Sequence, residues 1–132
     1  MQLAPSQPAM TQARLRLGKI GENLACVELE RRGYAILARR YRHGGAEIDI
    51  VARDGPTLVF VEVKAREGQE FGDGAEAVTR YKRRRIVVAA TDYLVRNRIG
   101  ECPCRFDVVS IQLGEGDPQI ELFQNAFDAS GS

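Results

Sequence analysis

Long apolar runs are absent from the sequence. No stretch approaches the roughly 20 consecutive apolar residues that a membrane-spanning helix needs, so the chain is not expected to cross a membrane. The N-terminus also lacks the charged start and apolar segment of a signal peptide, which makes a cytoplasmic location the expectation. At 132 residues the chain is long enough for one domain with a hydrophobic core of its own.

Cysteine and histidine are scarce. The three cysteines are Cys26, Cys102 and Cys104, and the single histidine is His43. A zinc set built from these four residues lacks the second closely spaced ligand pair of a structural zinc site, and Cys102 and Cys104 are too close in sequence for an easy disulfide. Reduced thiols in a cytosolic protein are therefore the favoured interpretation.

An excess of charge of one sign is also missing, because 19 basic residues nearly balance 18 acidic ones. The net charge of +1 indicates no partner, but basic residues cluster in segments 39–42 and 80–85. Local basic patches of this kind are what a phosphate backbone would contact. A solvated helix face is the more common meaning of such a run, although five cations in six residues require one side of a helix to present charge.

The strongest local signal is a hairpin in residues 47–64. Two short apolar runs flank the turn-forming segment 54–56, which predicts an antiparallel β-hairpin. If the turn is centred in that segment, the numbers of paired residues sum to 111. This register sets Asp49 directly opposite Glu62. Strand alternation then places Asp49, Glu62 and Lys64 on one face, and Ile48 and Ile50 together on the other.

The remaining pattern predicts the order of the elements. Helical periodicity indicates helices over residues 14–32 and about 75–98, and alternating apolar residues indicate strands over 34–41, 105–113 and 119–123 besides the hairpin. The sequence thus predicts an α/β fold: a helix, a three-stranded antiparallel meander, a helix, then one or two strands in a mixed sheet. One domain is expected over 14–123, with a mobile loop at 67–74 and flexible tails at 1–13 and 124–132.

The first predicted helix carries two stripes. One consists of Leu17, Ile20, Leu24 and Val27, and the other, headed by Glu22, of Ala25, Cys26 and Leu29. In one interpretation Glu22 points inward at the head of this small-residue stripe. In the other it is a solvated first-turn glutamate that complements the helix dipole.

Asp49 and Glu62 interrupt apolar runs at facing positions. Burying a carboxylate without a partner costs several kcal/mol, and like charges directly opposed destabilise a hairpin. A hard divalent cation such as Mg²⁺ or Mn²⁺ between the two carboxylates would remove both costs. Two other interpretations stay open: both acids lie at the solvated margin of the sheet, or Glu62 pairs with Lys64 or Arg66.

If a metal is held there, the surrounding residues acquire roles. Bound to Asp49, Glu62 and the Val63 carbonyl, it would polarise a phosphodiester and activate a water. Lys64 would steer that water or stabilise charge on the phosphate oxygens, and Glu22 would reach the metal through a water. Flanking phosphates would be held by sequence-independent contacts from Arg42, Lys82, Arg83, Arg84 and Arg85.

These motifs resemble those of the YraN-like family of bacterial proteins. The matching series comprises Gly21-Glu22 and segments 45–50, 59–64, 89–94 and 105–108, so the resemblance covers roughly residues 15–113. An E-x-K pair is common by itself, but Glu62 and Lys64 in order after Glu22 and Asp49 form a specific pattern. The family is similar to the archaeal Holliday-junction resolvases of the PD-(D/E)XK nuclease superfamily.

The resemblance implies a restriction-endonuclease-like fold and a Mg²⁺- or Mn²⁺-dependent DNA endonuclease. It suggests Asp49 and Glu62 as metal ligands, Lys64 as the catalytic lysine and Glu22 as an accessory acid. It also implies a homodimer, because resolvases act on two strands. Relatives often carry glutamine where Arg83 aligns. The alternative is a non-catalytic nuclease-like module that binds nucleic acid or a protein, because superfamily members that bind without cutting exist.

Overall fold

The chain folds into one mixed β-sheet with a helix on each face. The computed structural model describes residues 6–68 and 78–132, with residues 6–11 described as backbone only. Its elements are α1 (Ser6–Arg31), β1 (Ala35–His43), β2 (Ala46–Asp54), β3 (Thr57–Glu67), α2 (Arg80–Arg96), β4 (Cys104–Leu113) and β5 (Gln119–Phe127). The five strands lie in the order β1-β2-β3-β4-β5, with β3 and β4 parallel and the other neighbours antiparallel. The predicted α/β order is confirmed.

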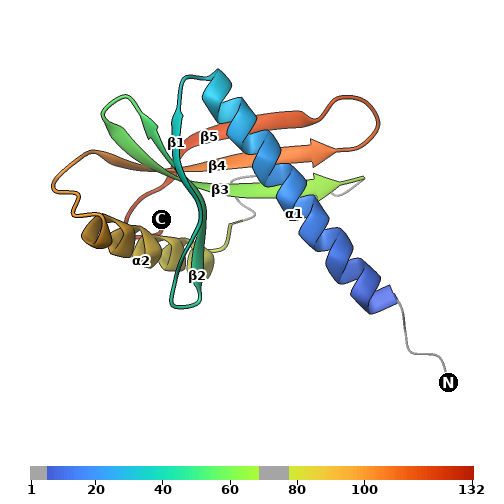
Figure 1. Ribbon diagram of the computed structural model, residues 1–132, viewed down its shortest axis with the longest axis horizontal. Helices are drawn as coiled ribbons and strands as arrows, with labels where there is room; N and C mark the ends of the chain where they lie inside the picture. Colours follow the sequence, from blue (N-terminus) through green and yellow to red (C-terminus); the bar gives the residue numbers. More distant parts are fainter. Residues whose placement is uncertain (1–5, 69–77) are drawn as a thin grey trace.

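The two helices cover opposite faces of the sheet (Figure 1). Alternate residues of β3 point to each side, because successive strand side chains alternate. Phe60 packs in a cluster with Tyr93 of α2, whereas Val61 packs in a cluster with Leu29 of α1. Helix α2 also forms the long crossover that the parallel strands β3 and β4 require.

Helix α1 begins at Ser6, earlier than the predicted start at residue 14. Residues 6–13, which were predicted to belong to a flexible tail, are therefore helical, and residues 1–5 lie outside the described range. Pro8 does not prevent this, because it stands in the first turn, where a backbone N–H has no intrahelical partner. The N-terminal half of α1 projects beyond the sheet (Figure 1).

Only one of the two predicted stripes of α1 is buried. Ala25 and Leu29 lie in the core, whereas Ile20 and Val27 are exposed. Leu24 of the other stripe packs partly buried against the core, but Ile20 and Val27 stay in solvent because α1 has the sheet on one side only. The helix also approaches β3 closely: a Cβ on Gly21 would lie 2.6 Å from the Cβ of Ala65, so glycine is required there.

Helix α2 buries one face against the sheet, as the helical periodicity of its residues indicates. Ile86, Ala90 and Tyr93 are buried, and the helix starts after the N-cap Thr79, whose hydroxyl accepts the backbone N–H of Lys82 at 3.2 Å. Residues 69–77 are not described, so most of the predicted loop 67–74 and the predicted start of this helix at 75 lie outside the described residues.

Strand β5 extends four residues past its predicted end, to Phe127. The predicted flexible tail at 124–132 was therefore wrong for residues 124–127. The physical reason is Phe127, whose ring is buried and stacks on Phe106 with ring centroids 5.0 Å apart. The last residues form a turn in which the Gly131 N–H donates to the Asp128 carbonyl at 2.9 Å.

The hairpin register is confirmed, but only up to the acids. Pairs whose numbers sum to 111 run from the turn to Ile50 opposite Val61, and the paired register ends there. The predicted shared face of Ile48 and Ile50 was wrong: Ile48 packs on the α2 side and Ile50 on the α1 side. Strand alternation is therefore interrupted at Asp49, which lies between them.

Candidate active site

Glu62 is a buried carboxylate, and one of its oxygens has no partner among the described residues. It lies in β3 and is 3% exposed. Its Oε1 forms an ion pair with Lys82 Nζ at 2.5 Å. Its Oε2 has no hydrogen-bond partner among the described residues. Such an atom bears the full cost of desolvation, so it marks a place where a ligand with positive charge is favoured.

Asp49 lies beside Glu62 at the point where β2 and β3 separate. Its Oδ2 accepts the backbone N–H of Val63 at 2.7 Å, so the side chain bonds a strand N–H where the paired register has ended. Burial, and then the charge of Glu62, raise the pKa of Asp49 to about 8. Because burial and a second nearby carboxylate both disfavour the ionised form of Asp49, this place favours added positive charge, either a proton or a cation.

Lysines from two elements face these acids. Burial alone would lower the pKa of Lys82, but the Glu62 carboxylate outweighs it and the pKa is raised. Lys64, two residues after Glu62 on β3, has a lowered pKa because of burial and then the charge of Lys82. Asp49, Glu62 and Lys64 are thus brought together as predicted, whereas the contact of Lys82 with Glu62 was not predicted.

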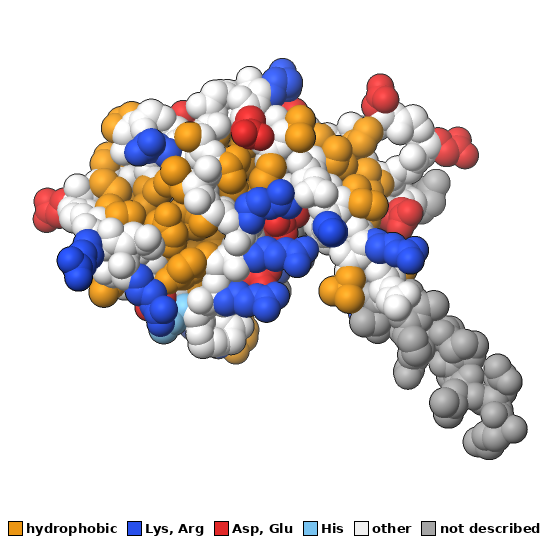
Figure 2. All heavy atoms as spheres, viewed as in Figure 1, with side chains coloured by type: hydrophobic (Ala, Val, Ile, Leu, Met, Phe, Trp, Pro, Cys, Tyr) orange, Lys and Arg blue, Asp and Glu red, His pale blue; other side chains and the backbone are white. Residues whose placement is uncertain are grey.

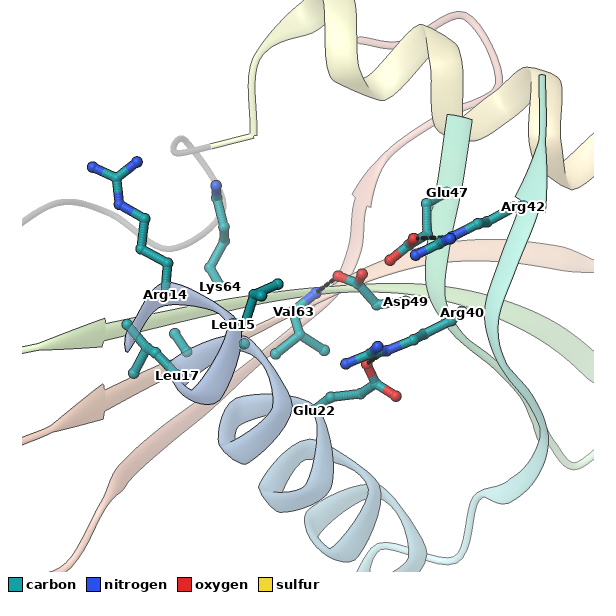
Figure 3. Close-up of a pocket in the computed structure, with 12 residues that line it drawn as sticks. Arg14, Leu15, Leu17, Glu22, Arg40, Arg42, Glu47, Asp49, Val63 and Lys64 are labelled. Atoms are coloured by element: carbon teal, nitrogen blue, oxygen red, sulfur yellow. Dashed lines mark hydrogen bonds and ion pairs between the residues drawn. The ribbon is translucent and has the colours of Figure 1, made fainter. Parts of the chain in front are cut away.

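Two cavities open on either side of Asp49. The larger, of about 520 Å³, lies between α1 and the sheet and is lined by Lys64, Asp49 and Glu22 among others (Figure 3). In Figure 3, Arg14 and Lys64 stand on one side of it, with Asp49 on the other. The smaller, of about 190 Å³, lies toward α2 and is lined by Asp49, Glu62 and Lys82. Both exceed the roughly 30 Å³ that one water occupies in the liquid.

Glu22 points inward, which is the first of the two interpretations given for it in the sequence analysis. It is buried and stands in the middle of α1, so the alternative of a solvated first-turn glutamate is wrong. Its Oε1 accepts from Arg39 Nε at 2.7 Å and its Oε2 from Arg40 Nε at 2.9 Å. Burial alone would raise the pKa of Glu22, but the hydrogen bonds from Arg40 and Arg39 lower it below the usual value.

The predicted nucleic-acid-binding residues fall into different surroundings. Arg42 is exposed and pairs with Glu47 at 2.7 Å, and Arg84 is exposed on α2. Arg85 lies over the Tyr81 ring at 5.6 Å from its centroid. Arg83 donates to the Val78 carbonyl at 2.9 Å and lies over Phe127, so it is engaged within the fold.

Basic side chains gather around acidic ones on the face shown in Figure 2, where α1 passes the first two strands. Two residues there, Arg14 and Arg40, line the larger cavity and were not predicted as site residues. Arg14 was missed because it belonged to the start of the first predicted helix, whose N-terminal extension the sequence did not indicate. Arg40 stood in a recognised basic cluster, so that cluster was the available signal.

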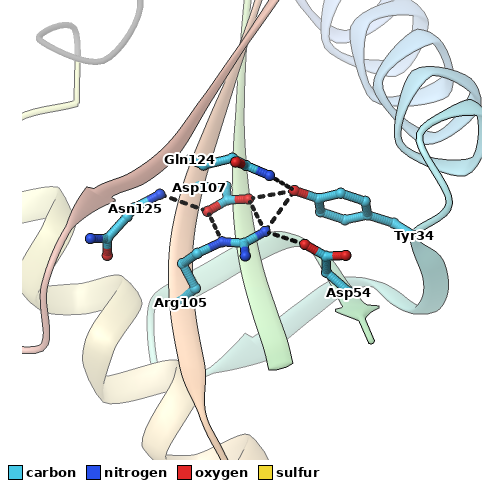
Figure 4. A network of polar contacts seen from close by, with 6 residues as sticks. All are labelled: Tyr34, Asp54, Arg105, Asp107, Gln124 and Asn125. Carbon is cyan, nitrogen blue, oxygen red and sulfur yellow. Dashed lines mark hydrogen bonds and ion pairs between the residues drawn. The ribbon is translucent and has the colours of Figure 1, made fainter. Parts of the chain in front are cut away.

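A second buried carboxylate, Asp107, stands among apolar residues of β4 and was not predicted as a site residue. It is 0% exposed in β4, where its Oδ1 accepts from Arg105 Nε and the Asn125 N–H, both at 2.9 Å (Figure 4). Its Oδ2 accepts from the Tyr34 hydroxyl and Arg105 Nη2, both at 3.1 Å. The Arg105 Nη2 also reaches Asp54 at 3.0 Å. The flanking apolar residues were the signal that could have predicted this burial.

The residues available for a metal are the two carboxylates. Among the residues that the structure describes, no three or more His, Cys, Asp or Glu side chains are grouped for metal binding. Asp49 and Glu62 can supply two ligands, which suits a Mg²⁺-like ion that keeps several waters and takes further oxygens from a substrate phosphate.

Across residues 6–68 and 78–132, none of the helices has the length and apolar character of a membrane span.

Comparison with known proteins places the chain among bacterial relatives. The model of the "Uncharacterised protein family UPF0102" matches residues 21–111. A "UPF0102 protein" of Geobacter metallireducens is 50% identical over 85% of this chain and 92% of its own length. "UPF0102 protein STH1475" of Symbiobacterium thermophilum is 47% identical over 86% of this chain and 98% of its own length. The family match spans every residue of the Asp49, Glu62 and Lys64 site, and the chain belongs to the UPF0102 family.

Proposed function

We propose that this protein is a metal-dependent nucleic-acid phosphodiester hydrolase, a DNA endonuclease of the PD-(D/E)XK type with resolvase-like substrates. The observation that carries the proposal is the buried Oε2 of Glu62, which has no partner among the described residues and lies next to Asp49 at the cavity of about 190 Å³. A purely structural acid would be saturated with hydrogen bonds, because unpaired buried oxygens are costly.

Asp49 and Glu62 would hold a Mg²⁺ or Mn²⁺ ion, and the orphaned oxygen together with the raised pKa of Asp49 supports their fit to a cation. When bound, such an ion polarises the scissile phosphate and makes a bound water more acidic. The Val63 N–H donates to Asp49 and keeps that carboxylate oriented toward Glu62.

Lys64 would act on the reacting phosphate. It lines the larger cavity together with Asp49, so its ammonium can stabilise charge that builds on phosphate oxygens. Its lowered pKa brings the amine closer to proton exchange at neutral pH, which suits a group that positions the attacking water. Glu22 would support the site by holding Arg40 at the cavity wall, while its other oxygen binds Arg39.

The nucleic acid would lie along the basic residues that border the cavities. Arg14 and Arg42 line the larger cavity, and Arg84 and Arg85 are presented by α2 near the β1–β2 turn. Contacts of this type are sequence-independent and weaken with added salt. A homodimer would place two such sites on two strands of a branched substrate.

A nuclease-like binding module is the second candidate, and one observation favours it. Lys82 already occupies Oε1 of Glu62, which leaves only Oε2 for a metal, and both oxygens of Glu22 are filled by arginines in this state. Such a module would bind nucleic acid or a protein without hydrolysis.

Cleavage of labelled four-way junctions, flaps, single strands and duplex DNA in Mn²⁺ or Mg²⁺ tests the proposal. Wild-type protein should cut at least one of these substrates, and a chelator should stop it. Asp49→Asn and Glu62→Gln should not cut, whereas Glu30→Gln, which changes an exposed acid on α1, should cut like the wild type. If wild type and both site variants bind DNA equally and none cuts, the binding module replaces the hydrolase.

A further inference from the structure

We propose that Lys82 is a built-in counter-cation of the metal site, which occupies Glu62 Oε1 until a divalent ion displaces it. This inference rests on the proposed metal-dependent function. In this inference Lys82 of α2 sets how tightly the site binds a divalent ion, in addition to any contact that it makes with phosphate.

The geometry of the contact supports exchange. Lys82 Nζ lies 2.5 Å from Glu62 Oε1, which is the distance of a direct charged contact. It covers one oxygen of the carboxylate and leaves Oε2 without a partner in the described residues. One ammonium therefore balances the charge of Glu62 but does not satisfy its oxygens, whereas a metal ion with its waters can do both.

Lys82 is partly exposed, so its side chain can leave Glu62 for solvent. Its side chain is 44% exposed while that of Glu62 is 3% exposed, so the ammonium can move into solvent and the carboxylate cannot follow. Lys82 stands in the first turn of α2, and the 190 Å³ cavity lined by Asp49, Glu62 and Lys82 lies beside the contact. That space holds several waters at roughly 30 Å³ each, enough for an ion with part of its hydration shell.

Charge balance links the two states. Without metal, the ammonium of Lys82 balances the charge of Glu62, while the neighbouring Asp49 accepts a hydrogen bond from the uncharged Val63 N–H. A divalent ion between the two acids would balance the charge of Glu62 itself, so Lys82 would no longer be required there. Once displaced, its ammonium remains at the mouth of the site, where a nucleic-acid phosphate would arrive.

Direct Mn²⁺ binding in the absence of nucleic acid tests this competition, measured by the electron paramagnetic resonance of free Mn²⁺. Lys82→Gln keeps a hydrogen-bond donor for Glu62 but removes the charge, and it should bind Mn²⁺ about tenfold more tightly than the wild type, or about 1.4 kcal/mol. Lys82→Arg, which keeps the charge, should bind no more tightly than the wild type. Arg53→Gln, which removes a charge from an exposed strand position, should match the wild type.

The outcomes separate the inference from the function. Equal or weaker Mn²⁺ binding by Lys82→Gln, with binding by the wild type, overturns the role of Lys82 and leaves the hydrolase intact. No binding by any variant overturns the metal site itself and the inference with it. Thermal unfolding without metal shows whether the Lys82→Gln protein folds. If it does not fold, a labelling experiment on the wild-type protein tests whether Mn²⁺ displaces Lys82 from Glu62.

Lysine acetylation read by mass spectrometry gives that second measurement. The chain has three lysines, Lys19, Lys64 and Lys82, and Lys19 is exposed on α1 as an internal reference. Adding Mn²⁺ should raise the acetylation rate of Lys82 severalfold relative to Lys19, because an amine released from Glu62 is open to the reagent. An unchanged ratio at a saturating Mn²⁺ concentration would show that Lys82 stays on Glu62, against the proposal.

Discussion

Asp107 and Glu62 are both buried acids on neighbouring strands of one sheet, but their surroundings differ. Each oxygen of Asp107 accepts two hydrogen bonds, from Arg105, Tyr34 and the Asn125 N–H. Glu62 has one cation, Lys82, on one oxygen and none on the other among the described residues. Saturation characterises an acid that holds the fold together, and an unpaired oxygen beside a cavity characterises an acid prepared for a ligand.

The position of each acid in the sheet explains this difference. Asp107 faces the corner where Tyr34, just after α1, and Asp54, at the hairpin turn, meet Arg105 (Figure 4). Glu62 lies where β2 and β3 have stopped pairing, and that separation opens the cavities. The first acid therefore joins elements, and the second lines the space between them.

The largest expected effect is on catalysis, from Glu62→Gln. This change should reduce Mn²⁺-dependent cleavage by about a thousandfold, because it removes a ligand charge worth several kcal/mol in the transition state. The free energy of unfolding without metal should change by less than about 1 kcal/mol, because the ion pair that the change removes is made with a half-exposed lysine. Cleavage assays and urea unfolding check both. A large decrease in metal-free stability would make Glu62 a structural acid like Asp107.

The matched acid-to-amide change in the other region is Asp107→Asn. It should lower the free energy of unfolding by about 3 kcal/mol, because the new amide donors face the donors of Arg105 in a fully buried place. Urea unfolding measures this, with Glu30→Gln as the exposed control. A decrease below about 1 kcal/mol, the range of exposed ion pairs, would remove the distinction between the two regions.

A smaller effect is expected from pH. Burial and the nearby Glu62 raise the pKa of Asp49 to about 8, above its usual value of 3.8. Between these values the folded chain keeps a proton that the unfolded chain has released. The stability of the metal-free protein should therefore fall as pH rises across this interval, by about 2–3 kcal/mol between pH 6 and 8.5.

Urea unfolding at the two pH values in the presence of chelator measures this decrease. Asp49→Asn should reduce it, because the amide does not titrate, whereas Glu30→Gln should keep it. Equal slopes for the wild type and Asp49→Asn would show that Asp49 is not the group responsible.

The smallest effect should come from Tyr34→Phe. The hydroxyl accepts from Arg105 Nη2 at 2.6 Å and from Gln124 Nε2 at 2.7 Å, and it donates to Asp107. Its removal should cost about 1 kcal/mol of unfolding free energy, because Arg105 keeps its bonds to Asp107 and Asp54. Calorimetry or urea unfolding measures the change, and Mn²⁺ binding should remain that of the wild type. Weakened Mn²⁺ binding would mean that the two regions are coupled.

Much of the fold could be predicted because its signals are local. The hairpin register follows from the turn at 54–56, and it is confirmed for the pairs next to that turn. The length of α1 and the extension of β5 to Phe127 were not predicted. Both depend on weak local signals, and for Phe127 the deciding contact is with Phe106 on another strand.

The candidate site was predicted in part for the same reason. Asp49, Glu62 and Lys64 lie on one hairpin, so the turn brings them near one another even though the paired register ends before Asp49. The ion pair of Lys82 with Glu62 joins residues from a helix and a strand, and the saturation of Glu22 depends on the path of β1. These contacts form only when the helices pack on the sheet.

The sequence by itself determined the order of elements, the hairpin register and the presence of acids among apolar residues, because these depend on neighbours along the chain. It could not distinguish Glu62 from Asp107, which carry the same local signature. Only the tertiary structure decided that Tyr34 and Arg105 saturate Asp107 and that Lys82 reaches one oxygen of Glu62. The physical reason is that a buried charge takes its partners from whichever elements pack against it.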